Sequence, residues 1–196
     1  MPSLIDRLQA RLQVTHAPPP PAAHPADLDW WPDVSIVPAA VLIPIIRRPE
    51  PSVLLTTRSE HLRKHSGQIA FPGGRIDPGD KGPVQAALRE AREEVGLNPA
   101  MVEIFGLAAP FRTGTGFLVQ PVVGALPADL PLRPNPAEVA DIFEVPLGYV
   151  LDRAHHQQKE AEFRGRMRRY HVIEWQGRHI WGATAGMLVQ LAGLLA

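Results

Sequence analysis

Hydrophobic residues recur at helical spacing between Gly82 and Gly96. Apolar side chains stand three and four positions apart from Val84 to Val95, so they form one stripe along an amphipathic helix. Gly96 lies where a residue in the left-handed conformation commonly ends a helix. We therefore predict a helix over residues 82–96. Three further helices are predicted, at residues 1–13, 146–154 and 182–195.

Runs of β-branched and aliphatic residues, bounded by proline and glycine, predict the strands. The first two cover residues 37–46 and 52–58, and a proline-rich turn joins them. A second proline-rich stretch, residues 127–137, predicts a loop. Further strands are predicted at residues 68–71, 102–112 and 118–126, with a pair over 162–180 that turns near Gly177. Strands mixed with helices at intervals favour an α/β (α+β) sandwich.

Composition excludes several classes of function. The 196-residue chain carries 20 basic and 20 acidic residues, so no global charge favours nucleic acid or an acidic membrane surface. The longest apolar run, residues 37–46, is interrupted by prolines and is too short to cross a bilayer. The chain has no cysteine, which excludes disulfides, thiolate metal ligands and a cysteine nucleophile. We expect a cytoplasmic protein that binds neither nucleic acid nor membrane.

Prolines cluster after the first predicted helix. Pro18–Pro21 and Pro25 are typical of a stiff polyproline spacer. We therefore expect an N-terminal helix with a proline-rich extension, residues 1–36, and a main domain, residues 37–196. The sequence does not set the oligomeric state, and a homodimer is compatible with it.

Three carboxylates gather on the helix predicted over residues 82–96. At ~100° per residue, Glu90, Glu93 and Glu94 are expected to project from one side, away from the apolar stripe. Such carboxylates repel one another unless a cation neutralises them, and Arg89 can hold Glu93 one turn away. The helix alone is typical of a solvated acidic face. Clustered carboxylate oxygens also suit Mg²⁺ or Mn²⁺.

A glycine-rich loop precedes this helix and changes its interpretation. In the sequence Phe71-Pro72-Gly73-Gly74-Arg75, two glycines stand where backbone must approach another group closely or adopt positive φ. A glycine loop that leads into an acidic helix favours a metal–diphosphate centre over a solvated surface.

Residues 74–97 resemble the Nudix box, in which a glycine and an acidic residue precede an Arg-Glu-apolar-x-Glu-Glu-x-Gly-apolar sequence. The matching residues are Gly74, Asp80, Arg89, Glu90, Ala91, Glu93, Glu94, Gly96 and Leu97. Asp80 stands where the box usually has Glu, and the gap from it to Arg89 is one residue longer than usual. The resemblance implies a Nudix fold, with a mixed β-sheet sandwiched between helices.

The resemblance also implies roles for these residues. Mg²⁺ or Mn²⁺ would be held by Glu90, Glu94 and Glu93, with help from the Gly73 carbonyl. Arg89 would orient Glu93. Either Glu93 or Glu138, which follows the 127–137 loop, would serve as the base, and the sequence does not choose between them. A solvated or helix-starting carboxylate is an equal alternative for Glu138.

Residues 54–74 resemble the extended motif of the coenzyme A pyrophosphatases, with Leu-Leu-Thr-x-Arg-Ser at its start and Phe-Pro-Gly-Gly at its end. This subfamily tolerates the longer loop with Asp. The resemblance implies that Arg58, Arg63 and Gly74 bind substrate; paired surface charges are the alternative for the two arginines. The implied reaction is hydrolysis of coenzyme A, or a derivative of it, to adenosine 3′,5′-bisphosphate and 4′-phosphopantetheine.

Other functions remain open at this point. A Nudix hydrolase for ADP-ribose or a nucleotide sugar would share the metal site and would not need the motif of residues 54–74. A non-catalytic nucleotide-binding Nudix module would not need the full set of Arg89 and the three glutamates. A purely structural acidic helix fits neither motif.

Overall fold

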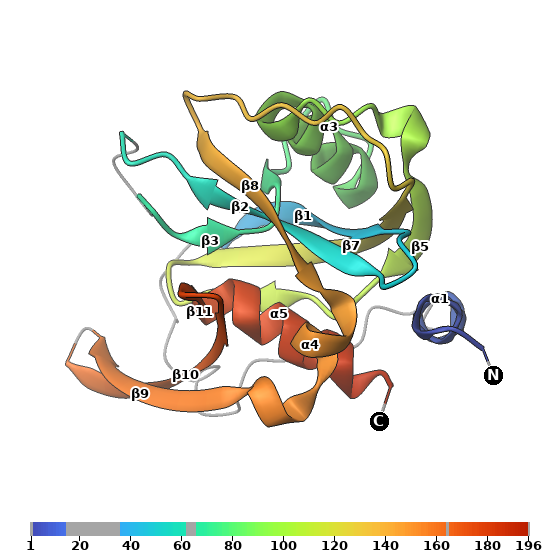
Figure 1. The fold of residues 1–196 in the computed structure, drawn as a ribbon. Helices are drawn as coiled ribbons and strands as arrows, with labels where there is room; N and C mark the ends of the chain where they lie inside the picture. Colours follow the sequence, from blue (N-terminus) through green and yellow to red (C-terminus); the bar gives the residue numbers. More distant parts are fainter. Residues whose placement is uncertain (1, 15–35, 62–65, 164, 196) are drawn as a thin grey trace.

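The computed structural model describes residues 2–14, 36–61, 66–163 and 165–195. In this part of the chain, helices lie on both faces of a large mixed β-sheet, and a smaller antiparallel sheet lies beside it (Figure 1). The predicted class, a mixed sheet sandwiched between helices, is confirmed. The proline-rich spacer predicted at residues 18–25 lies outside the described residues, and the boundary at residue 36 stays a prediction.

Eight strands make up the large sheet in the described residues: β1 (Val37–Ile46), β2 (Ser52–Arg58), β3 (Ile69–Ala70), β4 (Gly73–Arg75), β5 (Glu103–Leu107), β6 (Phe111–Arg112), β7 (Phe117–Leu126) and β8 (Val139–Pro146). β1 is central, since it pairs parallel with β7 and antiparallel with both β2 and β4. β2 also pairs with β3 and β8, and β7 with β5 and β6. This branching places the short β4 against β1 just before the chain enters the acidic helix.

The two faces of the large sheet form separate cores. The described helices are α1 (Leu4–Val14), α3 (Pro83–Val95), α4 (Leu147–Leu151) and α5 (Gly182–Gly193), with short 3-10 helices η1 (Pro99–Met101) and η2 (Arg153–His155). α3 covers one face, where its buried alanines cluster with Leu42, Leu54 and Val122. α1, α4 and α5 contribute to the core on the other face (Figure 1). β1 is apolar almost throughout because both of its faces are covered.

Local sequence sets both ends of α3. Pro83 occupies the first turn, where a missing amide costs nothing. Gly96 adopts φ 67° and ψ 18°, and its N–H donates to the Arg92 carbonyl at 3.0 Å. The Gly96 bond is that of an αL cap, in which the left-handed residue after the helix donates to the carbonyl four positions earlier. The Leu97 N–H also donates to the Ala91 carbonyl at 3.3 Å. The predicted helix and its glycine stop are confirmed.

Several strands differ from the sequence prediction. β4 was expected to be loop, because Gly73 and Gly74 carry no side chains that could show an alternation. β8 was not expected either, since Val139 and Val145 are its only buried residues. The single strand predicted at residues 102–112 is divided into β5 and β6.

The small sheet consists of β9 (Gln157–Phe163), β10 (Arg166–Trp175) and β11 (Arg178–Trp181), all antiparallel. Gly177, with φ 76°, lies in the β10–β11 turn, as predicted. β9 is polar and exposed, so it lacks the hydrophobic pattern that would have predicted it. Ile173 and Ile180 are fully buried in the core beneath α5, which holds this sheet to the body of the molecule. α4 and η2 stand where one helix was predicted at residues 146–154.

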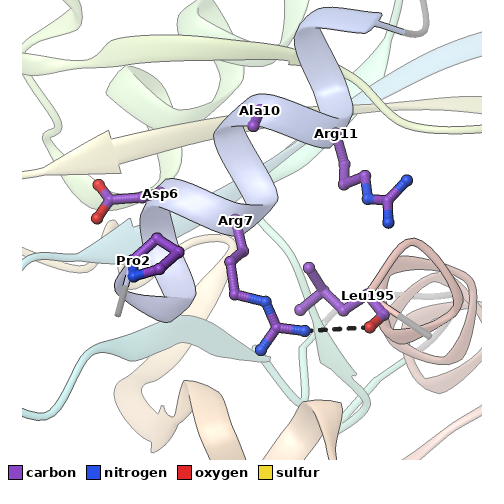
Figure 2. A pocket seen from close by; sticks show the side chains of 6 residues that line it. All are labelled: Pro2, Asp6, Arg7, Ala10, Arg11 and Leu195. Atoms are coloured by element: carbon purple, nitrogen blue, oxygen red, sulfur yellow. Dashed lines mark hydrogen bonds between the residues drawn. The ribbon is translucent and has the colours of Figure 1, made fainter.

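α1 is the amphipathic helix predicted near the N-terminus. Leu8 and Leu12 are buried in the core that also contains α5. Arg7 donates to the Leu195 carbonyl at 3.2 Å, and a cavity of about 250 Å³ lies beside this contact (Figure 2). The cavity is lined by Pro2, α1 and Leu195, and no described residue of α3 or of the glycine loop lines it. Among the described residues, no helix is long and apolar enough to span a membrane.

Candidate active site

β4 brings the glycine loop against both β1 and α3. Gly74 pairs with Ala40 and Gly73 with Val41. A Cβ atom at Gly73 would overlap the Ala40 carbonyl, and one at Gly74 would overlap the Glu90 carboxylate. The close approach predicted for these two glycines is therefore confirmed, and any side chain here would displace β1 or Glu90.

Glu94 is a buried carboxylate between α3 and the sheet. Its exposed fraction is 2%, so the expectation that all three glutamates project away from the apolar stripe is wrong for Glu94. It follows Ala87 by two turns, which places it at the edge of the buried stripe. The Gly73 N–H donates to its Oε2 at 3.2 Å, and Arg58 Nη1 lies 3.6 Å from its Oε1.

The surroundings of Glu94 leave its charge poorly compensated. Burial raises the pKa of Glu94 to about 7, because the ionised form loses its hydration. The Gly73 N–H and Arg58 lower this pKa in part, whereas the charges of Glu90 and Glu138 raise it further. The carboxylates of Glu90 and Glu138 therefore lie near enough to repel that of Glu94.

Glu90 and Glu93 are neighbours on α3 that differ in burial. Burial raises the pKa of Glu90, against the hydrogen bond that Arg89 Nη1 donates to it at 2.9 Å. Glu93 is turned outward, and half of its side chain is exposed. Arg89 Nη1 lies 3.3 Å from the Glu93 carboxylate, in the pairing one turn apart that the sequence predicts.

Arg89 also organises the loop ahead of the helix. Its Nε and Nη2 donate to the two carboxylate oxygens of Asp80, at 3.1 and 2.9 Å, and Nη2 donates to the Arg75 carbonyl at 3.1 Å. Asp80 further accepts from the Asp77 N–H at 2.8 Å. The hydrogen bond from Arg89 lowers the pKa of Asp80. Sequence reasoning assigned Arg89 to Glu93 and missed this forked pair, although the acidic position of the box pointed to Asp80.

Arg58, at the end of β2, faces the buried glutamate. Its Nε is buried and has no hydrogen-bond partner among the described residues. In this part of the chain, its guanidinium forms an ion pair with Glu94 at 3.6 Å. Ser59 follows, and its N–H donates to the Glu138 carbonyl at 2.8 Å. β2 and β8 thereby bring Arg58 and Glu138 to the acidic helix. Arg63 lies outside the described residues.

The donor set suits a divalent cation. Among the described residues, no three acidic or imidazole side chains converge on one point as a bound ion requires, because Glu90 is held by Arg89 and Glu94 by Gly73. Glu90, Glu94 and Glu138 nevertheless repel one another in a partly buried space. A hard cation bound between these carboxylates would relieve both the burial cost and the repulsion.

Comparison with known proteins identifies the family. The NUDIX domain family matches residues 37–170. The chain is 47% identical over 154 residues to a protein named uncharacterized Nudix hydrolase NudL from Escherichia coli (strain K12), covering 79% of this chain and 80% of that protein. The corresponding protein of Shigella boydii serotype 18 has the same identity and coverage. Among solved structures, a Nudix hydrolase from M. smegmatis, RenU, is similar with a TM-score of 0.49 and 27% identity, covering 58% of this chain and 73% of that one.

With the acidic helix, the glycine loop and this match all present, the chain belongs to the Nudix family and is a Nudix hydrolase. Nudix hydrolases generally use divalent metal cations.

Proposed function

We propose that this Nudix hydrolase cleaves the diphosphate of coenzyme A or its derivatives to adenosine 3′,5′-bisphosphate and 4′-phosphopantetheine. Arg58 is the observation that carries the proposal. It belongs to the 54–74 segment that resembles coenzyme A pyrophosphatases, its Nη1 lies 3.6 Å from Glu94 Oε1, and its buried Nε has no hydrogen-bond partner among the described residues. A guanidinium with an unused N–H beside clustered carboxylates suits a phosphate oxygen held next to a metal.

Each residue of the cluster has a role in this proposal. Mg²⁺ or Mn²⁺ would be held by Glu90, Glu94, Glu93 and the Gly73 carbonyl, and when bound would neutralise the diphosphate and activate water. Arg58 would bind a diphosphate oxygen, with Arg63 and the backbone of Gly74 also contacting substrate. Arg89 would hold Glu90 and Glu93 in place through the contacts already described.

We assign the base to Glu138. Glu93 is ion-paired with Arg89 and half exposed, whereas Glu138 lies near both Glu90 and Glu94. Glu138 would accept a proton from water as the water oxygen bonds to phosphorus. The bond from that phosphorus to the bridging oxygen breaks, and the leaving phosphate keeps the electron pair. Replacing the base, Glu138→Gln, is then expected to cost about 10²- to 10⁴-fold in kcat.

The substrate claim is tested by product analysis. Purified protein is incubated with Mg²⁺ or Mn²⁺ and with coenzyme A, ADP-ribose or a nucleotide sugar, and products are separated chromatographically. We expect adenosine 3′,5′-bisphosphate from coenzyme A at the highest kcat/KM, and a large loss in Arg58→Gln. Arg47→Gln is the matched control, because Arg47 pairs with Glu103 away from the cluster. Preferred hydrolysis of ADP-ribose or the sugar would contradict the assignment and leave the family intact.

A further inference from the structure

Arg178 joins the small sheet to the strand pair that carries Arg58. It begins β11, yet its Nη2 donates to Asp141 of β8 at 2.8 Å and its Nη1 to Thr57 of β2 at 3.4 Å. Its guanidinium carbon also lies 3.8 Å from the ring centroid of Phe143, a cation–π contact. One side chain from β11 therefore spans two neighbouring strands of the large sheet.

The strands are irregular at the position that Arg178 contacts. Thr57 pairs with Asp141, but the next residue, Arg58, pairs with Val139. Ala140 is thus the extra residue of a β-bulge, and bulges re-aim neighbouring side chains. Without the bulge, Arg58 would stand opposite Ala140, and the chain after it would slip by one residue relative to β8. The bulge decides which part of β8 meets Arg58.

The residues after the bulge are those of the active site. The Ser59 N–H donates to the Glu138 carbonyl at 2.8 Å, and Arg58 Nη1 lies 3.6 Å from Glu94. We propose that Arg178 is a positioning residue for hydrolysis: it clamps β2 to β8 beside the bulge and so sets the position of Arg58 relative to Glu94. This inference rests on the role proposed above for Arg58.

Amide hydrogen exchange tests the clamp without reference to activity. In Arg178→Gln, the Ser59 amide is expected to exchange faster, because its bond to Glu138 lies just beyond the bulge. The Leu147 amide, which donates to the Pro51 carbonyl at 2.7 Å near the other end of the same strand pair, is expected to keep its protection. Arg169→Gln is the matched control, since it removes an exposed pair with Glu160 from the same small sheet. Unchanged exchange at Ser59, or equal loss at Ser59 and Leu147, would overturn the clamp.

A double-mutant cycle tests whether the clamp acts through Arg58. We expect Arg178→Gln to lower kcat/KM for coenzyme A about 10- to 100-fold, as small misplacements near reacting groups do. In the Arg58→Gln background the same change is expected to cost about threefold or less, because the side chain that Arg178 positions is already gone. Arg178→Lys keeps the charge and loses the fork, so it should recover part of the activity.

The outcomes distinguish the positioning role of Arg178 from the proposed substrate contact of Arg58. Equal, multiplicative losses in both backgrounds would mean that Arg178 does not act through Arg58, and would overturn the positioning role. A wild-type rate in Arg58→Gln would instead contradict the proposed substrate contact of Arg58, while the exchange at Ser59 still decides whether Arg178 clamps the bulge.

Discussion

Glu94 and Glu144 are two glutamates held near opposite ends of β2. Glu144 accepts hydrogen bonds from Arg48 Nε and Nη2, both at 2.9 Å, and from the Ser52 hydroxyl. The bonds from Arg48 lower the pKa of Glu144. Glu94 is far more buried, yet it accepts one backbone N–H and meets Arg58 only at 3.6 Å, and burial raises its pKa to about 7.

Glu144 is a carboxylate that stabilises the fold, whereas Glu94 is one whose charge the fold compensates only in part. The chain supplies Glu144 with a bidentate guanidinium and a hydroxyl, so its ionised form is favoured. The chain surrounds Glu94 with further carboxylates, which raises the cost of its charge. Such a residue is typical of a site completed by a ligand.

Glu94 and Glu144 should differ most in their effect on activity. Glu94→Gln is expected to lower kcat/KM for coenzyme A by at least about 100-fold, because metal neutralisation supplies several kcal/mol at the transition state. Glu144→Gln, the matched variant, should remain within about twofold of wild type. The measurement is steady-state turnover at saturating Mn²⁺. Similar losses in both variants would remove the distinction between the two carboxylates.

In the metal-free protein, Glu94→Gln should raise the free energy of unfolding at alkaline pH, although it lowers activity. The raised pKa of Glu94 means that the folded state holds its proton more tightly than the unfolded state. The stability contributed by this tighter proton binding is fully present below about pH 4.5 and is lost as pH rises through about 7. Glu94→Gln should therefore be more stable than wild type at pH 8, by about 3 kcal/mol at most, and equal to it near pH 4. Urea unfolding in EDTA measures this; a variant less stable at pH 8 contradicts it.

Replacing Arg89 should reduce activity by an intermediate amount. Arg89→Lys keeps the positive charge but loses the fork that binds Asp80 while reaching Glu90. Residues that orient metal ligands typically account for 10- to 100-fold in activity or metal affinity, and we expect about that loss here. Arg92→Gln is the control, since Arg92 is exposed on the same helix. Full activity and Mn²⁺ affinity in Arg89→Lys would show that the fork does not hold the site.

Glu144 should give the smallest effect, confined to stability. Its lowered pKa contributes stability above pH 4.5 that is lost as pH falls through the folded-state value. Glu144→Gln is expected to cost roughly 1 kcal/mol at pH 7, a typical net value for a hydrogen-bonded ion pair at the edge of a sheet. The cost should shrink as pH falls below 4.5 in urea unfolding. A cost that does not change as pH falls points to packing, not charge.

Local features of the site could be predicted from the sequence. α3 and its Gly96 cap follow from helical spacing and a single glycine, both properties of one short stretch. The close approach at Gly73 and Gly74 also followed from residue type alone. The pairing of Arg89 with Glu93 was predictable because the two are one turn apart on the same helix.

Features that depend on distant segments could not be predicted. Glu94 is buried because β4 crosses beside α3, and β4 has no side-chain pattern of its own. β8 was missed because few of its residues are buried, so the bulge opposite Arg58 was missed with it. Arg178 reaches Thr57 across 121 positions in the chain, a contact that no local pattern encodes.

Mn²⁺ binding measured in the absence of substrate decides whether Glu94 is a metal ligand. Electron paramagnetic resonance titration would compare wild type, Glu94→Gln and Glu144→Gln at pH 7.5. The proposed site predicts that wild type and Glu144→Gln bind Mn²⁺ with the same Kd and that Glu94→Gln binds at least about tenfold more weakly. Equal Mn²⁺ affinity in all three proteins would contradict a metal site at Glu94.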